Sequence, residues 1–309
     1  MINELKENTE IKQNFLVSQM TKGVTNKGDA YLNITLQDKT GTIEGRKWQV
    51  EQGDEDIFKQ GNIVEIVAQV IEYRSVLQLK VGRGRILNLN DVDIIDYIPS
   101  APVARETMQR KLFDYVNMIE NEQIKKVVES IVKENMIAIS IYPAASRNHH
   151  EYASGLLHHT VSMLDDANAL TKLYKQLNKS FLFAGIILHD IGKTIELSGP
   201  IIPKYTTEGR LVGHISIISA IVKETCDKLE VDEEVRIILE HLVLSHHGKK
   251  EFGSPVLPMM LEAEVIYLID NLDARINMIT KMLDTVEEGE FSSRAPFLED
   301  RSFYKPKIK

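Results

Sequence analysis

With 309 residues, the chain is long enough for two domains or for one large domain. Its apolar content of 43% and charged content of 27% are ordinary for a globular protein. The formal net charge of −8 excludes a protein coated in basic residues for nonspecific binding to nucleic acid. Neither the first 95 residues nor the remainder is basic, so any such contact must come from a local patch.

Cysteine content and apolar runs predict a cytoplasmic protein that does not contact a membrane. The single Cys226 excludes an internal disulfide framework and fits a reducing compartment. The opening sequence MINELKENTE lacks the apolar region of a signal peptide. The longest apolar runs, such as FLFAGIIL, are too short to span a bilayer.

The first 95 residues show the alternation of β-strands. In AYLNITLQD, Leu32, Ile34 and Leu36 share one face, and polar residues share the other. A turn at 38–41 leads to a returning strand at 42–48, and further strands are expected at 14–23, 62–73 and 76–81, the last two separated by a turn at Arg74 and Ser75. Five antiparallel strands of this length predict a small closed barrel, of which the OB-fold is the commonest type.

Aromatic and basic residues gather on the polar side of these strands. The segment 73–85 has four basic residues and no acidic one. Aromatic rings can stack on bases while cations follow the phosphates, so the pattern predicts a groove for single-stranded nucleic acid. The alternative is a barrel without a ligand, in which Trp48 caps the core. The candidate binding residues are Tyr31, Arg46, Trp48, Tyr73, Arg74, Lys80, Arg83 and Arg85.

The remainder of the chain is predicted to be helical. Two prolines in 96–105 indicate an extended linker. Met108, Leu112, Tyr115 and Ile119 then follow at helical spacing. Further helices are expected at 121–136, 155–177, 180–190, 214–229, 232–246 and 258–283. We therefore expect a barrel domain at 1–95, a linker at 96–105, an all-α domain at 106–286, and an arm or partly disordered tail at 287–309.

All nine histidines lie between His149 and His247. Histidine and aspartate recur at intervals of some 24 to 32 residues, about one helix and its loop, which lets successive helices each deliver a group to a shared centre. Imidazole and carboxylate are common ligands of divalent metals. Asp190 could bridge two ions, because His189 beside it can bind one of them. The series is His159, His189, Asp190, His214, His246, His247 and Asp270.

Several positions in this series leave alternatives open. An isolated histidine in a helix is usually packed or exposed, which applies to His149, His150, His158 and His241. Neighbouring helical residues point about 100° apart, so only one of His158 and His159 is expected to face the centre. Asp273 lies one turn after Asp270 and is either the ligand in its place or an exposed partner near Arg275.

The string HDIGK, preceded by GLLHHT and followed by GHI, SHHG and IDNLDA, resembles the HD-domain superfamily of metal-dependent phosphohydrolases. The longer strings NHHEYASGLLHHT, HHGKKEFGSPVLP and EAEVIYLIDNLDAR resemble one branch closely, the YhaM-type 3′→5′ exoribonucleases, which join an N-terminal OB-fold to an HD domain. The resemblance covers almost the whole chain, including YLNITLQDKTGTIEGRKW. The helical motifs are highly specific, whereas the barrel strings alone would be weak.

The resemblance implies a role for each matching residue. The defining metal set would be His159, His189, Asp190 and Asp270, and His214 with His246 would complete a second position shared through Asp190. His247 would be a ligand or a proton-transfer group, and Lys193 would lie near the substrate phosphate. Asp190, Lys193 and His247 are thus the expected catalytic residues. The doubled His158-His159 departs from the family pattern.

The resemblance also implies hydrolysis of single-stranded RNA from its 3′ end to nucleoside 5′-monophosphates. Attack by metal-bound hydroxide, without a covalent intermediate, would suffice. Manganese is the implied metal, as one ion or two, although such ligands also accept Fe²⁺, Mg²⁺, Co²⁺ or Zn²⁺. Single-stranded DNA is a possible second substrate, because stacking and phosphate contacts discriminate little between ribose and deoxyribose. The sequence does not decide between a monomer and a homo-oligomer.

Two other functions compete with this interpretation. A phosphohydrolase of small nucleotides, such as cyclic dinucleotides, would use the same metal centre but would not need a strand-binding barrel. A nucleic-acid-binding protein with an idle helical site would be expected to have lost one of its ligands, whereas the set here is complete.

Overall fold

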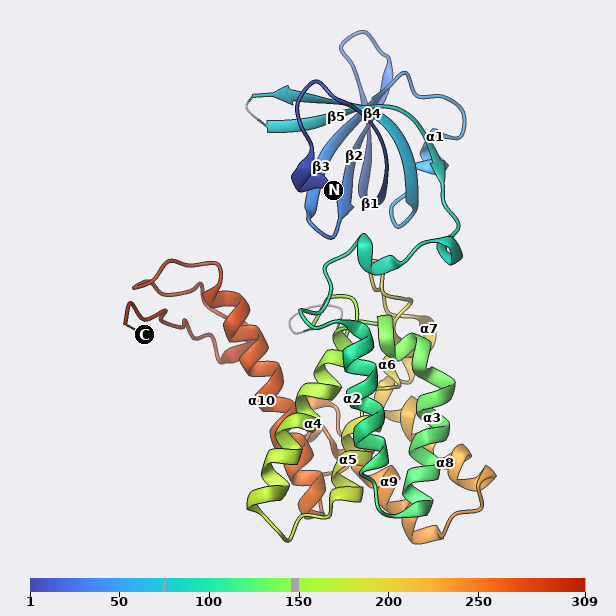
Figure 1. The fold of residues 1–309 in the computed structure, drawn as a ribbon, viewed down its shortest axis with the longest axis vertical. Helices are drawn as coiled ribbons and strands as arrows, with labels where there is room; N and C mark the ends of the chain where they lie inside the picture. The colour runs from blue at the N-terminus through green and yellow to red at the C-terminus, as the bar shows by residue number, and fades with distance from the viewer. Residues whose placement is uncertain (75, 146–149, 309) are drawn as a thin grey trace. The chain divides into compact units, whose positions relative to one another are not determined.

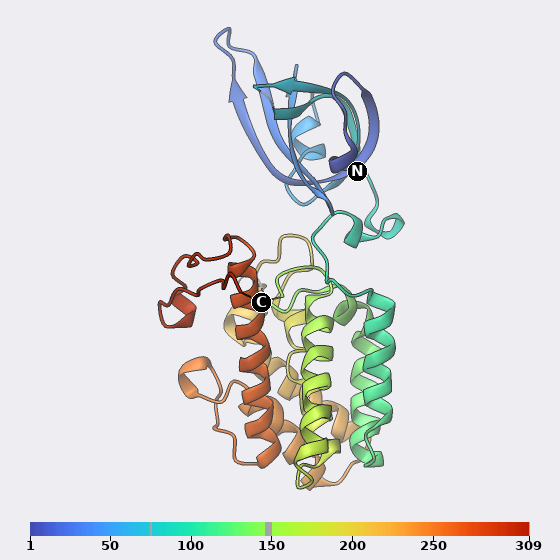
Figure 2. The same cartoon turned by 60° about the vertical axis from the view of Figure 1, so that its left-hand side comes forward.

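A computed structural model describes residues 1–74, 76–145 and 150–308. Ser75 of the predicted turn and His149 lie outside these residues. The chain divides into two compact units, Met1–Ser100 with Pro200–Ile202, and Ala101–Gly199 with Pro203–Lys309. Figures 1 and 2 show a barrel of strands in the first unit and a bundle of helices in the second.

The first unit is a closed five-stranded barrel with the strand order β1-β2-β3-β5-β4. β1 is long enough to pair antiparallel with both β2 and β4, and β3 pairs in parallel with β5. The expected OB-fold is therefore confirmed. The short α1 was not predicted, because four residues show no periodic pattern. The elements are β1 (Glu10–Val24), β2 (Ala30–Asp38), β3 (Gly41–Trp48), α1 (Asp54–Ile57), β4 (Ile63–Tyr73) and β5 (Val76–Ile86).

Alternate side chains fill the inside of the barrel. Leu32, Ile34 and Leu36 are fully buried, as their spacing predicted. Phe58, which follows α1 directly, is also fully buried and packs into the same core. Most of the alternating polar residues of β2 and β3 lie on the other face, whereas Asp38 and Lys47 are buried.

The second unit is built mainly from α-helices, and every longer helix predicted from periodicity is present. Two short helices, α6 and α7, interrupt the segment that was expected to be loop. The helices are α2 (Arg105–Asn117), α3 (Glu122–Ile141), α4 (Gly155–Leu173), α5 (Lys179–Leu188), α6 (Lys193–Glu196), α7 (Thr207–Leu211), α8 (His214–Lys228), α9 (Glu233–Ser245) and α10 (Leu261–Leu283). Short 3₁₀ turns occur at Ile2–Glu4, Leu89–Asp91, Ile94–Asp96, Lys250–Phe252 and Pro296–Leu298.

Helix α5 lies at the centre of this bundle. The side-chain oxygen of Asn178 accepts hydrogen bonds from the backbone N–H groups of Ser180 and Phe181 and so caps its first turn. Its residues from 182 to 188 are all buried, and it packs against α2, α3, α4, α9 and α10. A helix that is apolar all round belongs in a core. Whatever follows α5 in the chain is consequently delivered to the middle of the unit.

Beyond α10 the chain forms an irregular arm. Isolated bridges pair Phe291 with Tyr304 and Ala295 with Arg301. A two-fold ion pair between Arg275 and Glu299 joins the arm to α10. Within the described residues, none of the helices combines the length and apolarity that crossing a bilayer requires.

Close packing around α5 predicts the effect of Gly185→Ala. In an open helix this change stabilises by about 0.5–1 kcal/mol. Here a Cβ would lie 2.3 Å from Cδ1 of the fully buried Ile266 and 3.3 Å from Cβ of Leu242. We therefore expect a loss of about 1–3 kcal/mol, seen as a lower Tm for the helical circular dichroism at 222 nm. The single Trp48 lies in the barrel, so its fluorescence transition should stay unchanged; an unchanged or higher helical Tm would contradict the packing argument.

Candidate metal centre

Five helices bring the histidines and aspartates of the sequence series together. Each side chain lies at or near the end of its helix, or on the helix face that is turned toward α5. Successive residues of the series are separated in sequence by about one helix and its loop, so each helix contributes to the same centre. His159 comes from α4, His189 and Asp190 follow α5, His214 begins α8, His246 and His247 follow α9, and Asp270 lies on α10.

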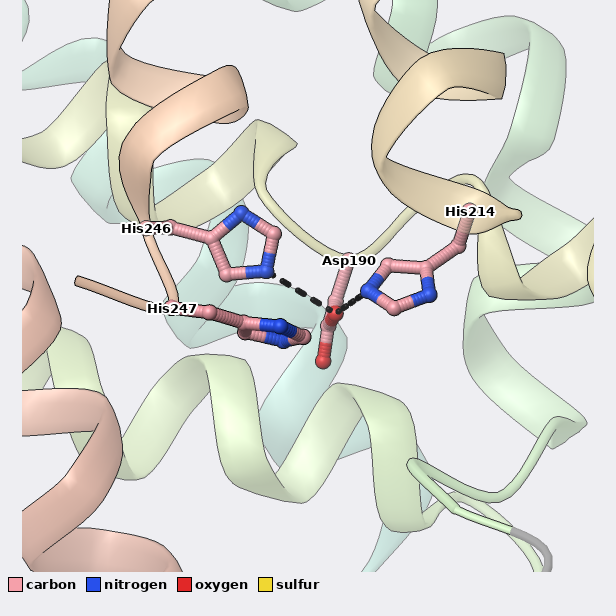
Figure 3. Close-up of side chains that lie close together, drawn as sticks. All are labelled: Asp190, His214, His246 and His247. Carbon is pink, nitrogen blue, oxygen red and sulfur yellow. Dashed lines mark ion pairs between the residues drawn. The ribbon is translucent and has the colours of Figure 1, made fainter. Parts of the chain in front are cut away.

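Asp190 lies between two groups of metal-ligating atoms. In the first, His159, His189 and Asp190 each offer one atom within 4.8 Å of the others. In the second, Asp190 is joined in the same way by His214, His246 and His247. Figure 3 shows the imidazoles of His214 and His246 turned toward one oxygen of Asp190, at 3.5 and 3.8 Å, with His247 beside them. The two groups share Asp190 alone.

The outer nitrogens of these imidazoles are occupied by hydrogen-bond acceptors. Nδ1 of His189 bonds to the carbonyl of Ile186 at 2.7 Å, and Nδ1 of His246 bonds to that of Val243 at 2.7 Å. Both carbonyls lie in a last helical turn, where they lack an intrahelical partner. A carbonyl can only accept, so Nδ1 carries the hydrogen, and in the neutral imidazole Nε2 presents its lone pair to the centre. Ligand histidines are commonly oriented in this way.

The nitrogen and oxygen atoms that face the centre are buried without hydrogen bonds within the described part of the chain. Nε2 of His189, His214 and His246 and Oδ1 of Asp190 make no hydrogen bond to any residue that the structure describes. Leaving a buried acceptor unsatisfied costs about 1–3 kcal/mol for each group. Several such atoms converging on one space fit divalent metal ions, which satisfy imidazole and carboxylate together.

The structure distinguishes between the neighbouring candidates on α4 and α10. His159 is fully buried, and its Nε2 lies 3.2 Å from Oδ1 of Asp270. His158 instead bonds through Nδ1 to the hydroxyl of Tyr152 at 2.7 Å. Asp273 contacts the other side of the His159 ring, with Oδ2 2.6 Å from Nδ1. The geometry favours His159 and Asp270 for the inner positions.

One alternative for Asp273, an exposed partner near Arg275, is wrong. The other alternative, a metal ligand, stays a prediction, and Asp273 shares a group of metal-ligating atoms with His150 and His159. It is 8% exposed and accepts a second hydrogen bond from Nε2 of His150 at 2.7 Å, whereas Arg275 pairs with Glu299. Asp273 is therefore placed to orient His159 from the outer side of its ring. Neither this role nor that of His150 was predicted, because the pairing joins residues more than 110 positions apart; the run NHHEYASGLLHHT was the available signal.

Glu196 on α6 was also missed. Its Oε1 lies 3.0 Å from Nδ1 of His214 and also accepts the backbone N–H of that residue. Gly192 allows the close approach that this needs, since a Cβ there would lie 2.3 Å from the carbonyl oxygen of His214. The acid stands six residues after Asp190, in the continuous string HDIGKTIE.

Opposed charges dominate the electrostatics of the centre. Burial acts to raise the pKa of Asp190, but His189 and Lys193 outweigh it and hold that pKa well below its ordinary value. Burial disfavours the charged form of His159, yet hydrogen bonds to Asp270 and Asp273 prevail and raise its pKa to about 10. The two carboxylates therefore favour the protonated form of His159.

Lys193 is engaged with the centre itself. Its Nζ lies 2.6 Å from Oδ2 of Asp190. Burial disfavours its charge, but Asp190 outweighs burial and raises the pKa of Lys193. The same side chain borders a cavity of about 440 Å³ next to the centre, lined by Lys193, His247, Phe252, Tyr267, Asp270, Asn271 and Ala274.

On the barrel, four of the eight candidate binding residues gather on β2, β3 and β5. Tyr31 and Trp48 are cross-strand partners with ring centroids 5.1 Å apart, and the guanidinium of Arg46 lies 5.8 Å from the Trp48 ring. Lys80 is opposite Arg46 in the parallel pairing. Trp48 is 40% exposed, so it does not cap the core.

The other four candidates lie elsewhere on the barrel. Tyr73 ends β4, and the guanidinium of Arg74 lies 5.3 Å from its ring centroid. Arg83 and Arg85 lie opposite β4, and Nε of Arg85 is 2.8 Å from a carboxylate oxygen of Glu65. The absence of acid from segment 73–85 was therefore misleading, since Glu65 comes from the neighbouring strand.

Comparison with known proteins shows which family the chain belongs to. Residues 156–275 match the HD domain. The 3′-5′ exoribonuclease YhaM of Geobacillus sp. (strain WCH70) is 44% identical over 94% of this chain and 90% of its own length, and that of Bacillus subtilis (strain 168) is 42% identical over 99% and 97%. The second OB-fold domain of replication protein A from Methanococcus maripaludis is 27% identical over 28% of this chain and 92% of its own, with a TM-score of 0.24. The chain belongs to the family of the YhaM 3′-5′ exoribonucleases.

Proposed function

We propose that this chain is a metal-dependent 3′→5′ exoribonuclease that releases nucleoside 5′-monophosphates from single-stranded RNA. The observation that carries the proposal is the set of buried Nε2 atoms that converge on Asp190 without hydrogen-bond partners among the described residues. Relatives of almost the same length bear the name of this activity, which supports it.

The ligand groups described above would hold two ions on either side of Asp190. His159 and His189 would serve one position, with Asp270 beside it, and His214 and His246 the other. When bound, divalent ions act as Lewis acids and lower the pKa of coordinated water toward neutrality. We propose Mn²⁺ as the native ion, because a mixed imidazole and carboxylate set accommodates it.

Residues that border the cavity would act on the phosphate. Lys193 borders both Asp190 and the cavity, so its charge would offset the charge that develops on a bound phosphate. His247 donates from Nδ1 to the carbonyl of Phe252, which leaves Nε2 able to accept a proton or bind a metal. Burial lowers the pKa of His247, so it is neutral at pH 7.

We assign strand binding to the barrel, residues 1–95, and hydrolysis to residues 106–286, joined by the linker 96–105 and followed by a tail from 287. The paired rings of Tyr31 and Trp48 would stack on bases, and Arg46 and Lys80 would contact phosphates. Stacking is tolerant of the sugar, so single-stranded DNA would be a second substrate. The one cysteine, Cys226, is buried and free, which supports a cytoplasmic location.

The proposal is tested with single-stranded RNA labelled at its 5′ end and incubated with Mn²⁺. We expect a ladder that shortens from the 3′ end and disappears with EDTA. Asp190→Asn should reduce the rate by at least about 100-fold, because it removes the shared ligand. Asp227→Asn changes an exposed carboxylate on α8 and should be neutral. Intact RNA with the unaltered protein, or a ladder that persists in Asp190→Asn, would contradict the proposal.

The outer position of Asp273 predicts a milder phenotype. Asp273→Asn keeps the shape but removes the negative charge that contacts His159, so we expect Mn²⁺ affinity to fall by roughly 10- to 100-fold. Excess Mn²⁺ should restore most of the activity, whereas it should not rescue Asp190→Asn. Failure of excess metal to rescue Asp273→Asn would mean that Asp273 is itself a ligand.

The raised pKa of His159 predicts that metal binding expels a proton. With a pKa of about 10 this histidine is charged at pH 7.5, and its Nε2 must be deprotonated to bind a metal. The apparent affinity should therefore rise with pH below 10, by up to about tenfold per unit. Titration calorimetry in buffers of different ionisation enthalpy should report release of about one proton per protein from this group. An enthalpy that does not depend on the buffer would refute this assignment.

The barrel surface predicts a defect that depends on RNA length. Trp48→Ala should weaken binding of a long single strand by roughly 10- to 100-fold, through the loss of one stacked base. Cleavage of a dinucleotide, which has no further nucleotides beyond the scissile bond to offer the barrel, should be unaffected and serves as the internal control. Equal binding of the long strand by variant and unaltered protein would place the strand elsewhere.

A further inference from the structure

The cavity beside the metal centre contains an aromatic wall that the hydrolytic chemistry does not use. Lys193, His247 and Asp270 border it on the side of the centre, and the remaining lining comes from Phe252, Tyr267, Asn271 and Ala274. Its volume of about 440 Å³ falls in the lower part of the range of small-molecule sites, about 300–1,000 Å³. It can hold one nucleoside.

One stripe of α10 joins the aromatic wall to the centre. Tyr267, Asn271 and Ala274 follow at i, i+4 and i+7 and so share a helix face, with Asp270 one turn from Tyr267. The short side chain of Ala274 leaves room beside the amide of Asn271. A group packed on the Tyr267 ring is therefore adjacent to the carboxylate of the centre.

The loop after α9 fixes the two rings in place. Gly248 has φ +74°, and a Cβ there would lie 2.3 Å from the Tyr267 ring, so bare backbone packs against that ring. Nδ1 of His247 bonds to the carbonyl of Phe252 at 2.8 Å and closes the loop. Nζ of Lys249 lies 5.3 Å from the Phe252 centroid, yet the side chain of Phe252 remains 51% exposed. The rings are held at the cavity without belonging to the hydrophobic core.

We propose that this cavity receives the 3′-terminal nucleoside of the RNA, with its base stacked on Tyr267 and bordered by Phe252. The assignment rests on the proposed function. It identifies stacking on Tyr267 as the interaction that holds the 3′ end of the RNA beside the metal centre. Every base has a flat π-face, so stacking holds any of the four. A cavity for one nucleoside matches the single residue that an exonuclease releases at each step.

The test compares two RNAs that differ only at the 3′-terminal residue, which carries either its base or a hydrogen in place of the base. In Mn²⁺ the unaltered protein should remove the complete residue with a kcat/KM roughly 10- to 100-fold higher. Tyr267→Leu keeps apolar volume but loses the ring, so the ratio should fall to near one. Tyr267→Phe should preserve the ratio. Tyr174→Leu, an exposed tyrosine that lines a different groove, is the matched control.

The outcomes separate this inference from the function on which it rests. A ratio near one in the unaltered protein, or an unchanged ratio in Tyr267→Leu, overturns the inference while RNA degradation stands. Failure to degrade either RNA overturns the proposed function and the inference with it. If circular dichroism shows that Tyr267→Leu is unfolded, Phe252→Leu on the exposed loop provides the test, and its ratio should also fall.

Discussion

The buried carboxylate of Asp190 is the feature on which the helical unit depends. Moving a charge into a protein interior is costly unless partners compensate it. Lys193 supplies one partner at 2.6 Å, and the imidazoles around Asp190 offer ring nitrogens within 4.8 Å of its carboxylate. Helix α5 is apolar on every side, which places its final residues at the centre of the bundle. Each of the longer helices around α5 then needs to contribute only one or two polar side chains to the surroundings of Asp190.

Hydrogen bonds on the side away from Asp190 orient the imidazoles of the centre. His189 and His246 each bond through Nδ1 to a carbonyl in the last turn of the preceding helix. One contact thus satisfies a helix end and fixes the tautomer of a ligand. On His159 and His214 the outer Nδ1 contacts a carboxylate instead, from Asp273 and Glu196, which orients each ring. A substitution at one of these partners should therefore alter metal affinity without removing a ligand.

The sequence predicted the features that depend on local pattern. Alternation placed Leu32, Ile34 and Leu36 in the barrel core, and helical spacing located the long helices. The histidine and aspartate intervals anticipated which residues the helices bring together. Contacts between distant segments were beyond such patterns: Asp273 reaches His150 across 123 positions, and Glu65 neutralises Arg85 from a neighbouring strand. The pairing of Lys193 with Asp190 likewise depends on how the turn after α5 folds.

The proposed binding of metal ions on either side of Asp190 can be observed directly. The most direct measurement is anomalous X-ray diffraction from crystals of the full chain soaked in Mn²⁺, recorded at an energy where manganese scatters anomalously. We expect peaks in contact with the Asp190 carboxylate, one facing His159 and His189 and the other facing His214 and His246. The absence of such peaks, or peaks bound only to other residues, would contradict the proposed binding.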